Sequence, residues 1–359
     1  MRFSAIVRAH PPSGWCISSM ITLVVGAQYG GEGKGKVAAY LATREQFYAS
    51  CRTGGVNSSH TIVLGNATVH LRMLPAAALV DPNVRVIYGA GSLIHIPTLL
   101  GEMSSHKVWP RRIMIDPQAG IISDDLINEQ RKDTRYKRIG STLTGTGYAT
   151  AERAKRRLTL AKECADVRDM LTENIIEFLS DADTRGLPIL LEGHQAFGLS
   201  NYHGDYPYVS SRDCTVAEML SEVGLHIRNG NPRVVLAVKA FPTRNHHGSL
   251  PHEIDRAQAR ELGIHEEGGG AWDRPNKPRR VATIDFNIIK RAVHANGATE
   301  IALTGVDHLD TRMAGARSIE SISHKVFQFI SKLEQHTGVW VRYLSTGPGV
   351  LEMIDRGAV

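Results

Sequence analysis

The sequence is poor in cysteine and has none of the cysteine patterns that bind zinc or build a disulfide framework. Its 359 residues hold four cysteines, at positions 16, 51, 164 and 214, and no C-x-x-C pair. Scattered cysteines of this kind are typical of reduced thiols. The chain also has no apolar run near the roughly 20 residues of a membrane-spanning helix. We therefore expect a cytoplasmic protein that does not contact a membrane.

Long runs of basic residues are missing as well, although the chain is basic overall. The formal net charge is +6 and the isoelectric point is about 9.1. Lysine and arginine gather only in short clusters, such as Lys155–Arg157 and Arg279–Arg280. Such clusters fit anion sites better than a nucleic-acid surface. The sequence has no internal repeat, heptad pattern or low-complexity tract either. We expect small polyanionic ligands and no nucleic-acid partner.

The first 20 residues lack the sustained apolar stretch of a secretory signal. They contain Pro11, Pro12 and Gly14, and Met20 stands directly before the first apolar run. We expect residues 1–20 to be a disordered N-terminal extension, and we leave open whether they belong to the native protein. Residues 21–359 are expected to form a single domain.

From residue 21 onward, short apolar runs alternate with helical patterns. Runs such as Ile21–Val25, Pro188–Leu191 and Val234–Phe241 are typical of strands buried on both faces. Apolar residues at helical spacing predict helices over Ile94–Met103 and Val167–Leu179. This alternation predicts an α/β fold with a mainly parallel central sheet flanked by helices.

The most distinctive stretch follows the first predicted strand. Five glycines lie between residues 26 and 35, and Lys34 and Lys36 open the next helical pattern. Uncovered backbone N–H groups, a helix N-terminus and two lysines together form a cradle for phosphate. The stretch is not a Walker A loop, because Gln28 and Gly35 replace two residues that the motif requires. A tight strand-to-helix turn with solvated lysines is the alternative interpretation.

This stretch resembles the N-terminal signature of the adenylosuccinate synthetase family, G-x-Q-W-G-D-E-G-K-G-K. Other family motifs are matched by Gly55–Thr61 (G-H-N-x-G-H-T), Gly140–Gly147 (G-T-T-G-R-G-I-G), His203–Ser211 (H-G-T-Y-P-Y-V-T-S) and Ser345–Pro348 (S-T-G-P). The resemblance runs from about residue 21 to 354. It implies the adenylosuccinate synthetase fold, which is P-loop NTPase-like, and a ligase that replaces a purine 6-oxo group with the amine of aspartate.

The matched motifs also imply roles for individual residues. Catalytic roles fall on His60, Lys34 and Gln195, with His60 beside the transferred phosphoryl group. The implied binding residues for the substrate nucleotide are Gly31, Asn57, Ser141, Thr142, Arg156, Gln195 and Ser210. The implied residues for the donor triphosphate are Gly30, Glu32, Gly33, Lys34, Gly35, Lys36, His60, Thr61, Asp307, Ser345, Thr346, Gly347 and Pro348.

Further roles concern aspartate, metal and assembly. Lys277 and Arg279 match the aspartate-binding segment, in which an arginine can hold a carboxylate bidentately. Ser59 stands where a backbone carbonyl of the family reaches the metal, so Mg²⁺ is the expected cofactor. Arg156 matches an arginine that reaches the substrate phosphate of the neighbouring subunit. The resemblance therefore implies a homodimer with shared active sites.

One departure from the family bears on the substrate. Gly31 replaces an aspartate that serves the family as catalytic base and metal ligand. The C2 amine of guanine lies next to N1 and would crowd a side chain there, whereas glycine leaves that space open. Phage 2-aminoadenylosuccinate synthetases, a branch that joins dGMP or GMP to aspartate, also lack this aspartate. The chain resembles this branch, and its expected location is then the host cytoplasm.

A second departure bears on the donor, since Gly305 replaces the lysine of the family's T-K-x-D motif. We expect ATP or dATP to be used as well as, or instead of, GTP. Two other interpretations stay open: an ordinary adenylosuccinate synthetase using IMP and GTP, and an inactive nucleotide-binding or regulatory protein. The role of His194, which replaces a small residue, is left open. So is the group that takes the N1 proton, for which water, Gln195 and a substrate phosphate are candidates.

Overall fold

The fold is organised around a nine-stranded sheet with the strand order β16-β15-β14-β10-β1-β9-β2-β5-β7. The computed structural model describes residues 20–227, 230–245, 247–262, 264 and 280–358. Neighbouring strands of this sheet are parallel except for β15 and β16. Its strands are β1 (Ile21–Gly26), β2 (Ala49–Arg52), β5 (Arg85–Tyr88), β7 (Ile113–Ile115), β9 (Ile189–Glu192), β10 (Arg233–Lys239), β14 (Glu300–Thr304), β15 (Trp340–Ser345) and β16 (Met353–Asp355). The predicted mainly parallel sheet is confirmed.

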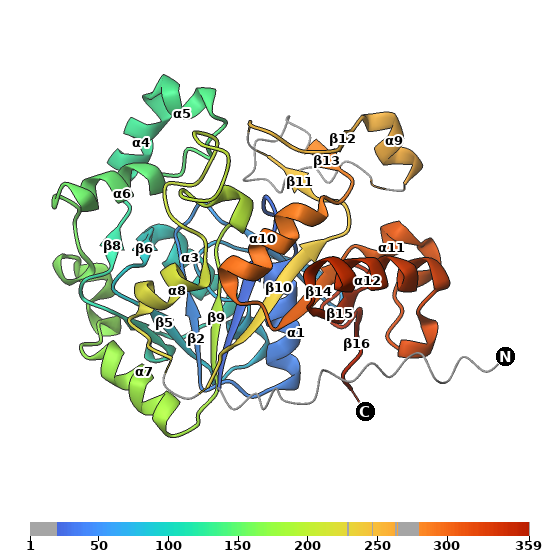
Figure 1. The fold of residues 1–359 in the computed structure, drawn as a ribbon. Coiled ribbons are helices and arrows are strands. Elements are labelled where there is room, and N and C mark those ends of the chain that lie inside the picture. Colours follow the sequence, from blue (N-terminus) through green and yellow to red (C-terminus); the bar gives the residue numbers. More distant parts are fainter. Residues whose placement is uncertain (1–19, 228–229, 246, 263, 265–279, 359) are drawn as a thin grey trace.

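Helices cover both faces of the sheet, as Figure 1 shows. Along β1, Leu23 packs against the core on one face and Val24 against the core on the other. The first core includes α7, α8, α10 and α12, and the second includes α1, α2 and α3. The α-helices are α1 (Lys34–Arg44), α2 (Ala77–Val80), α3 (Ile96–His106), α4 (Asp124–Lys132), α5 (Thr134–Arg138), α6 (Thr146–Ala154), α7 (Ile175–Thr184), α8 (Val216–Val223), α9 (Arg256–Glu261), α10 (Phe286–Asn296), α11 (Val306–Leu309) and α12 (His324–Thr337).

Smaller elements surround the sheet. Strands β3 (His60–Leu64) and β4 (Ala67–Leu71) form a hairpin, β6 (Leu93–Ile94) pairs with β8 (Gly120–Ile121), and β13 (Arg280–Ala282) lies between β11 (Thr243–Arg244) and β12 (Glu253–Ile254). Short 3₁₀ helices are η2 (Pro110–Arg112), η3 (Ala161–Glu163), η4 (Ala165–Met170), η5 (Phe197–Leu199), η6 (Thr311–Met313) and η7 (Ile319–Ser321). Figure 1 places α4–α6 and the β11–β13 sheet at the same end of the molecule.

The helix predicted over Val167–Leu179 is wrong as a single element. Instead, η4 (Ala165–Met170) precedes α7 (Ile175–Thr184), and the chain turns between them. Asn174, directly before α7, adopts a left-handed conformation with φ 64°. Leu171, directly after η4, is already extended and forms a β-bridge to Ile115. The extended Leu171 and the left-handed Asn174 interrupt the helix while leaving the apolar spacing intact. The expected extension lies almost wholly outside the described residues, which begin at Met20.

In the part of the chain that the structure describes, no helix has both the length and the apolar character needed to cross a bilayer. The described cysteines Cys51, Cys164 and Cys214 are free thiols. Burial raises the pKa of the Cys51 thiol above its usual range, as expected for an inert core residue.

Candidate functional site

A cleft of about 640 Å³ opens at the edge of the sheet where the parallel strands end. This size suits a small-molecule ligand. Its lining follows the carboxyl ends of β1, β2, β9, β10, β14 and β15. Parallel strands that end at one edge bring residues distant in sequence to the same place. The lining includes Tyr29–Lys36, Asn57–Thr61, Val63, His70, Thr142, Gln195, Lys239, Thr243, Asn245, Thr304, Gly305, Asp307, His308, Ser345, Gly347 and Pro348.

The glycine-rich stretch forms the floor of this cleft and leads into α1. Gly30, Gly31 and Gly33 have φ values of 95°, 74° and 79°, a region that most side chains disfavour. Helix α1 begins after Gly33 without a side-chain cap. Its first N–H groups are therefore available to an anion, as predicted for a phosphate cradle.

Glu32 holds the glycine-rich turn through hydrogen bonds to its carboxylate. Its carboxylate is fully buried and accepts hydrogen bonds from the backbone N–H of Gly30 at 2.7 Å and from Lys34 Nζ at 3.0 Å. The backbone carbonyl of Glu32 in turn accepts a hydrogen bond from the Thr304 hydroxyl at 3.1 Å. These contacts fix the turn against β14, so Glu32 supports the cradle and Lys34 supplies its adjacent positive charge.

Lys36, also predicted to bind the donor, holds the C-terminal turn. Its Nζ donates to Ser345 Oγ at 2.7 Å, to the Gly347 carbonyl at 2.5 Å and to the Glu352 carbonyl at 2.9 Å. An ammonium group has three donors, so all of them are used. Burial lowers the pKa of Lys36 to about 8. Its ammonium group thus anchors the turn that carries Ser345–Pro348 beside the cleft.

His60 lies at the start of β3 within a buried charged network. Its Nδ1 contacts Glu192 Oε1, and Arg52 Nη1 donates to the same oxygen at 2.7 Å. Burial, with the nearby guanidinium of Arg52, lowers the pKa of His60 to about 4 despite the opposite effect of Glu192. The imidazole is therefore neutral at pH 7. Its Nε2 is buried and has no hydrogen-bond partner among the described residues.

A smaller pocket adjoins the cleft and collects most of the predicted substrate residues. Asn57, Ser141, Thr142, Gln195 and Ser210 all line it. Gln195 has a positive φ of 49° and donates from Nε2 to the Asn57 carbonyl at 3.3 Å. Asn57 Oδ1 and Ser210 Oγ are buried without partners in the described structure. Unpaired buried polar atoms that converge on one pocket are what a polar ligand would satisfy.

Thr146 belongs to this pocket although the motif comparison did not single it out. It is the first residue of α6, after Gly145 with φ 87°, and its buried Oγ1 has no partner in the described part of the chain. A hydroxyl and free N–H groups at a helix N-terminus suit a phosphate. A Gly-Thr pair before a helical pattern was the available sequence signal.

Some predicted residues lie away from the cleft. Arg156 is exposed, has φ 63° and lines neither pocket. Thr346 is buried, and its hydroxyl donates to the Ala316 carbonyl at 2.7 Å. Lys277 and Arg279 lie outside the described residues, so their predicted contacts with aspartate stay a prediction.

The position at which the family's T-K-x-D motif has its lysine is open. Gly305, at φ 73°, precedes α11, and a Cβ added to it would meet only His308 Cδ2, at 3.5 Å. Asp307 and His308 also line the cleft. A carboxylate and an imidazole, without a long side chain at 305, therefore surround this end of the cleft.

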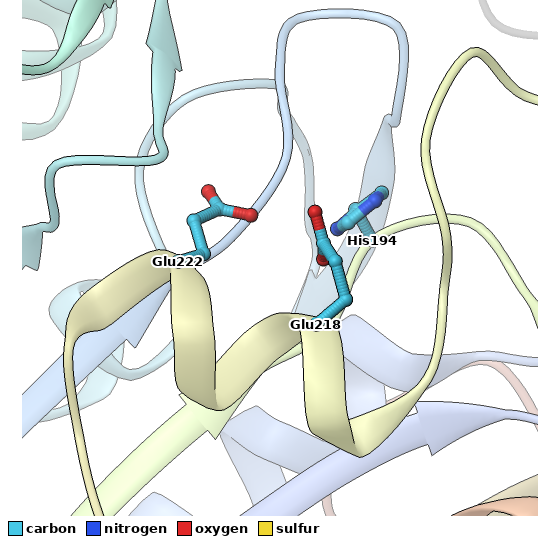
Figure 2. A group of neighbouring side chains, drawn as sticks. All are labelled: His194, Glu218 and Glu222. Atoms are coloured by element: carbon cyan, nitrogen blue, oxygen red, sulfur yellow. The ribbon is translucent and has the colours of Figure 1, made fainter.

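His194 lies directly behind the loop that carries Asn57. Its ring packs on Gly54, where an added Cβ would lie 2.4 Å from His194 Cγ, and its Nδ1 is 3.1 Å from Thr53 Oγ1. Figure 2 shows the ring facing Glu218 and Glu222 of α8. Glu222 accepts a hydrogen bond from the Gly54 backbone N–H at 2.7 Å. His194 thus packs against this loop, and its buried Nε2 has no hydrogen-bond partner among the described residues.

Arg212 supplies the positive charge of this cluster. Its Nη2 donates to Glu218 at 2.5 Å and to Glu222 at 2.9 Å. Burial and the neighbouring Glu222 carboxylate raise the pKa of Glu218 to about 7. Because a guanidinium already bridges the two carboxylates, we interpret the cluster as an ion-pair network and not as a metal centre.

Comparisons with known proteins identify the family of the chain. A family model described as adenylosuccinate synthetase matches residues 23–175 and 158–313. The adenylosuccinate synthetase of Methanocaldococcus jannaschii is 36% identical over 338 residues, covering 93% of this chain and 96% of the relative. That of Archaeoglobus fulgidus is 34% identical over 339 residues, with 93% and 97% covered.

Solved structures show the same fold. Fully ligated adenylosuccinate synthetase from Plasmodium falciparum superposes with a TM-score of 0.86 at 21% identity, covering 94% of this chain and 99% of that one. Succinoaminodeoxyadenylate synthetase of cyanophage S-2L, bound to dGMP and to dATP as an energy donor, has a TM-score of 0.79 at 24% identity, with 94% and 95% covered. The chain therefore belongs to the adenylosuccinate synthetase family, ligases that form a C–N bond between aspartate and a nucleotide with the use of a nucleoside triphosphate.

Proposed function

We propose that this enzyme joins L-aspartate to C6 of a guanine nucleotide, dGMP or GMP, and forms a 2-aminoadenylosuccinate nucleotide. Phosphorylation of O6 by a nucleoside triphosphate makes that oxygen a good leaving group. The aspartate amine then attacks C6, and the oxygen departs as phosphate. Such chemistry depends on positioning and on electrostatic stabilisation of the migrating phosphoryl group.

Gly31 is the observation that carries the choice of guanine. It lines the cleft, is exposed to it and has no Cβ where the family carries an aspartate. Space for a C2 amine beside N1 is what a guanine nucleotide requires and IMP does not. The cyanophage structure supports the proposal to the extent that a protein of this fold is bound to dGMP. Between the two guanylates we favour dGMP, on the likeness to the cyanophage protein alone.

An ordinary adenylosuccinate synthetase acting on IMP is the second candidate. The archaeal relatives named adenylosuccinate synthetase are 32–36% identical to this chain, above the 24% of the cyanophage protein. Overall similarity thus favours IMP, whereas the residue beside the purine favours a guanylate. We give more weight to Gly31 because a single site residue can decide between substrates that differ by one polar group.

The donor proposal follows from Gly305. Lysine would supply an aliphatic stem over the donor base, and Gly305 supplies none. We propose that ATP and dATP are accepted as well as, or in place of, GTP. Asp307 is then the charged group facing the base.

Mg²⁺ fits this site mainly as an ion carried by the donor phosphates. Of the described acidic side chains that line the cleft, Glu32 already bonds Gly30 and Lys34, and Asp307 lies at the base end. Ser59 is exposed within the cleft. Magnesium commonly keeps several waters and binds through substrate phosphates with few protein ligands. When bound, it would neutralise phosphate charge beside Lys34.

We also propose that the enzyme is a homodimer in which Arg156 serves the active site of the neighbouring subunit. Arg156 lies outside its own cleft at the end of α6, exposed to solvent. An arginine that serves the substrate phosphate of a second subunit needs such an exposed position.

One assay separates the candidate functions. Purified protein, Mg²⁺ and aspartate are mixed with ATP, dATP or GTP and with dGMP, GMP or IMP, and the products are identified by mass. We expect product from dGMP or GMP. Product from IMP alone would establish the ordinary synthetase, and no product from any pair would favour an inactive nucleotide-binding protein. A Lys34→Ala variant purified in parallel shows whether the activity comes from this chain or from a host enzyme.

A further inference from the structure

Glu192 lies at the carboxyl end of β9 and is fully buried directly behind His60. Its Oε2 accepts a hydrogen bond from the Ala76 backbone N–H at 2.7 Å, and its Oε1 contacts both Arg52 and His60. Both carboxylate oxygens are therefore engaged. A buried carboxylate with this many partners is held in one orientation.

Arg52 completes the support from the end of β2. Its Nη1 donates to Glu192 at 2.7 Å, its Nη2 to the Ser58 carbonyl at 2.9 Å and its Nε to the Arg72 carbonyl at 3.2 Å. The guanidinium thereby ties the loop before His60 to the sheet. Arg52 thus holds the Glu192 side chain and the loop that contains Ser58 in fixed positions relative to each other.

This geometry selects one tautomer of His60. Nδ1 faces a carboxylate oxygen, which can only accept, so Nδ1 carries the hydrogen. The contact of Nδ1 with Arg52 Nη1, at 2.9 Å, then joins two donors and is no hydrogen bond. Nε2 keeps its lone pair and is the end of the ring without a partner among the described residues.

We propose that Glu192 is a positioning residue that fixes His60 as the Nδ1–H tautomer and turns its Nε2 to the reacting groups in the cleft. The arrangement follows the general logic of a histidine oriented by a buried carboxylate. The inference rests on the proposed catalytic role of His60, but not on which purine nucleotide is the substrate.

The test uses Glu192→Gln, which preserves size and removes the charge, with Glu300→Gln as matched control. Glu300 is also buried and is paired with Arg233 and Arg342, but it begins β14 at the end of the sheet opposite the cleft. We expect Glu192→Gln to lower kcat about 100-fold, within the range of general acid–base effects, with KM values changed less than about threefold. Glu300→Gln should lose thermal stability and keep its kcat.

Two readouts make the outcome specific. In the double variant Glu192→Gln/His60→Asn, the loss should equal that of His60→Asn alone, because Glu192 acts only through His60. Nitrogen-15 NMR of ligand-free wild-type protein should show His60 as the Nδ1–H tautomer, and the Gln variant should show a mixture. Losses that multiply in the double variant, or an Nε2–H tautomer in the wild type, would overturn the proposal. The NMR measurement does not require turnover. It therefore tests the tautomer of His60 even if the proposed function is wrong.

Discussion

Gly31 combines an unusual backbone conformation with a proposed role in substrate choice. Gly31 has φ 74°, a conformation that aspartate and asparagine tolerate better than most residues. Any substitution there therefore adds some backbone strain to its steric effect. A test of substrate choice has to separate the two contributions.

We predict that Gly31→Asp lowers kcat/KM for dGMP at least about tenfold relative to IMP, the scale on which pockets discriminate by one small group. Gly31→Asn, of equal size and no charge, should shift the ratio similarly, because crowding by the side chain is the cause. Gly31→Ala adds the same backbone strain but only a Cβ, so it should shift the ratio less than Gly31→Asp does. An unchanged ratio of dGMP to IMP turnover in Gly31→Asp would contradict the steric argument.

The N-terminus of helix α6 lies at the smaller pocket, where Thr146 is part of the lining. We predict that Thr146→Val raises KM for the nucleoside monophosphate about five- to tenfold, the loss of one hydrogen bond to a charged group. KM for the triphosphate should stay the same. Thr184→Val is the matched control, since that hydroxyl donates to the Ser180 carbonyl at 2.8 Å within α7 and lines neither pocket. Equal effects of both variants on monophosphate KM would argue against a ligand contact.

The turn between β15 and β16 depends on α1 through Lys36. Lys36→Met keeps the aliphatic stem and leaves Ser345 Oγ and two carbonyls without their donor. We predict a loss of about 1–3 kcal/mol in the free energy of unfolding and a raised KM for the donor. Denaturant titration and steady-state kinetics measure these quantities. Lys290→Met, on the exposed side of α10, is the control; a Lys36 variant as stable as that one would refute the anchoring role.

The sequence predicted most strands and helices by type, but it did not predict the break between η4 and α7. Buried strands such as β1 and β10 carry apolar runs that are recognisable in the sequence. The break before α7 begins at the extended Leu171, which bridges to Ile115, and ends at the left-handed Asn174. The apolar spacing of η4 and α7 continues across the break, so a pattern of hydrophobicity does not record it.

At the scale of the whole molecule, the site is assembled from contacts that cross the sequence. Short motifs predicted that His60, Gln195 and the glycine-rich turn belong to one cleft, and the structure places all of them on its lining. The contacts that support the site were not predicted, because they join positions far apart in the sequence. His60 and Glu192 are 132 residues apart, and Lys36 and Ser345 are 309 apart. Spacing within a motif carries no information on such partners.

Stability of the whole molecule should depend on pH through Glu218. Burial and Glu222 raise the pKa of Glu218 to about 7 in the folded state, above its usual value of 4.5. The folded state therefore holds a proton that the unfolded chain releases, and this contribution is full below pH 4.5 and lost as pH rises to about 7. Its size is on the order of 3 kcal/mol.

We predict that Glu218→Gln removes this dependence. Relative to the wild type, the variant should gain stability between pH 5 and pH 8, because the wild type alone loses the contribution of the proton. Chemical denaturation of both proteins at a series of pH values measures the difference curve. A difference that does not vary with pH would show that Glu218 is ionised throughout.

Strand β1 enters the sheet at Ile21 and reaches the cleft only at its other end, after Gly26. Anything joined ahead of Ile21 therefore starts from the side of the molecule remote from ligand entry. A fusion partner or a surface tether attached there leaves the mouth of the enzyme free, so immobilised protein should work as a nucleotide-converting reagent without redesign of its catalytic loops.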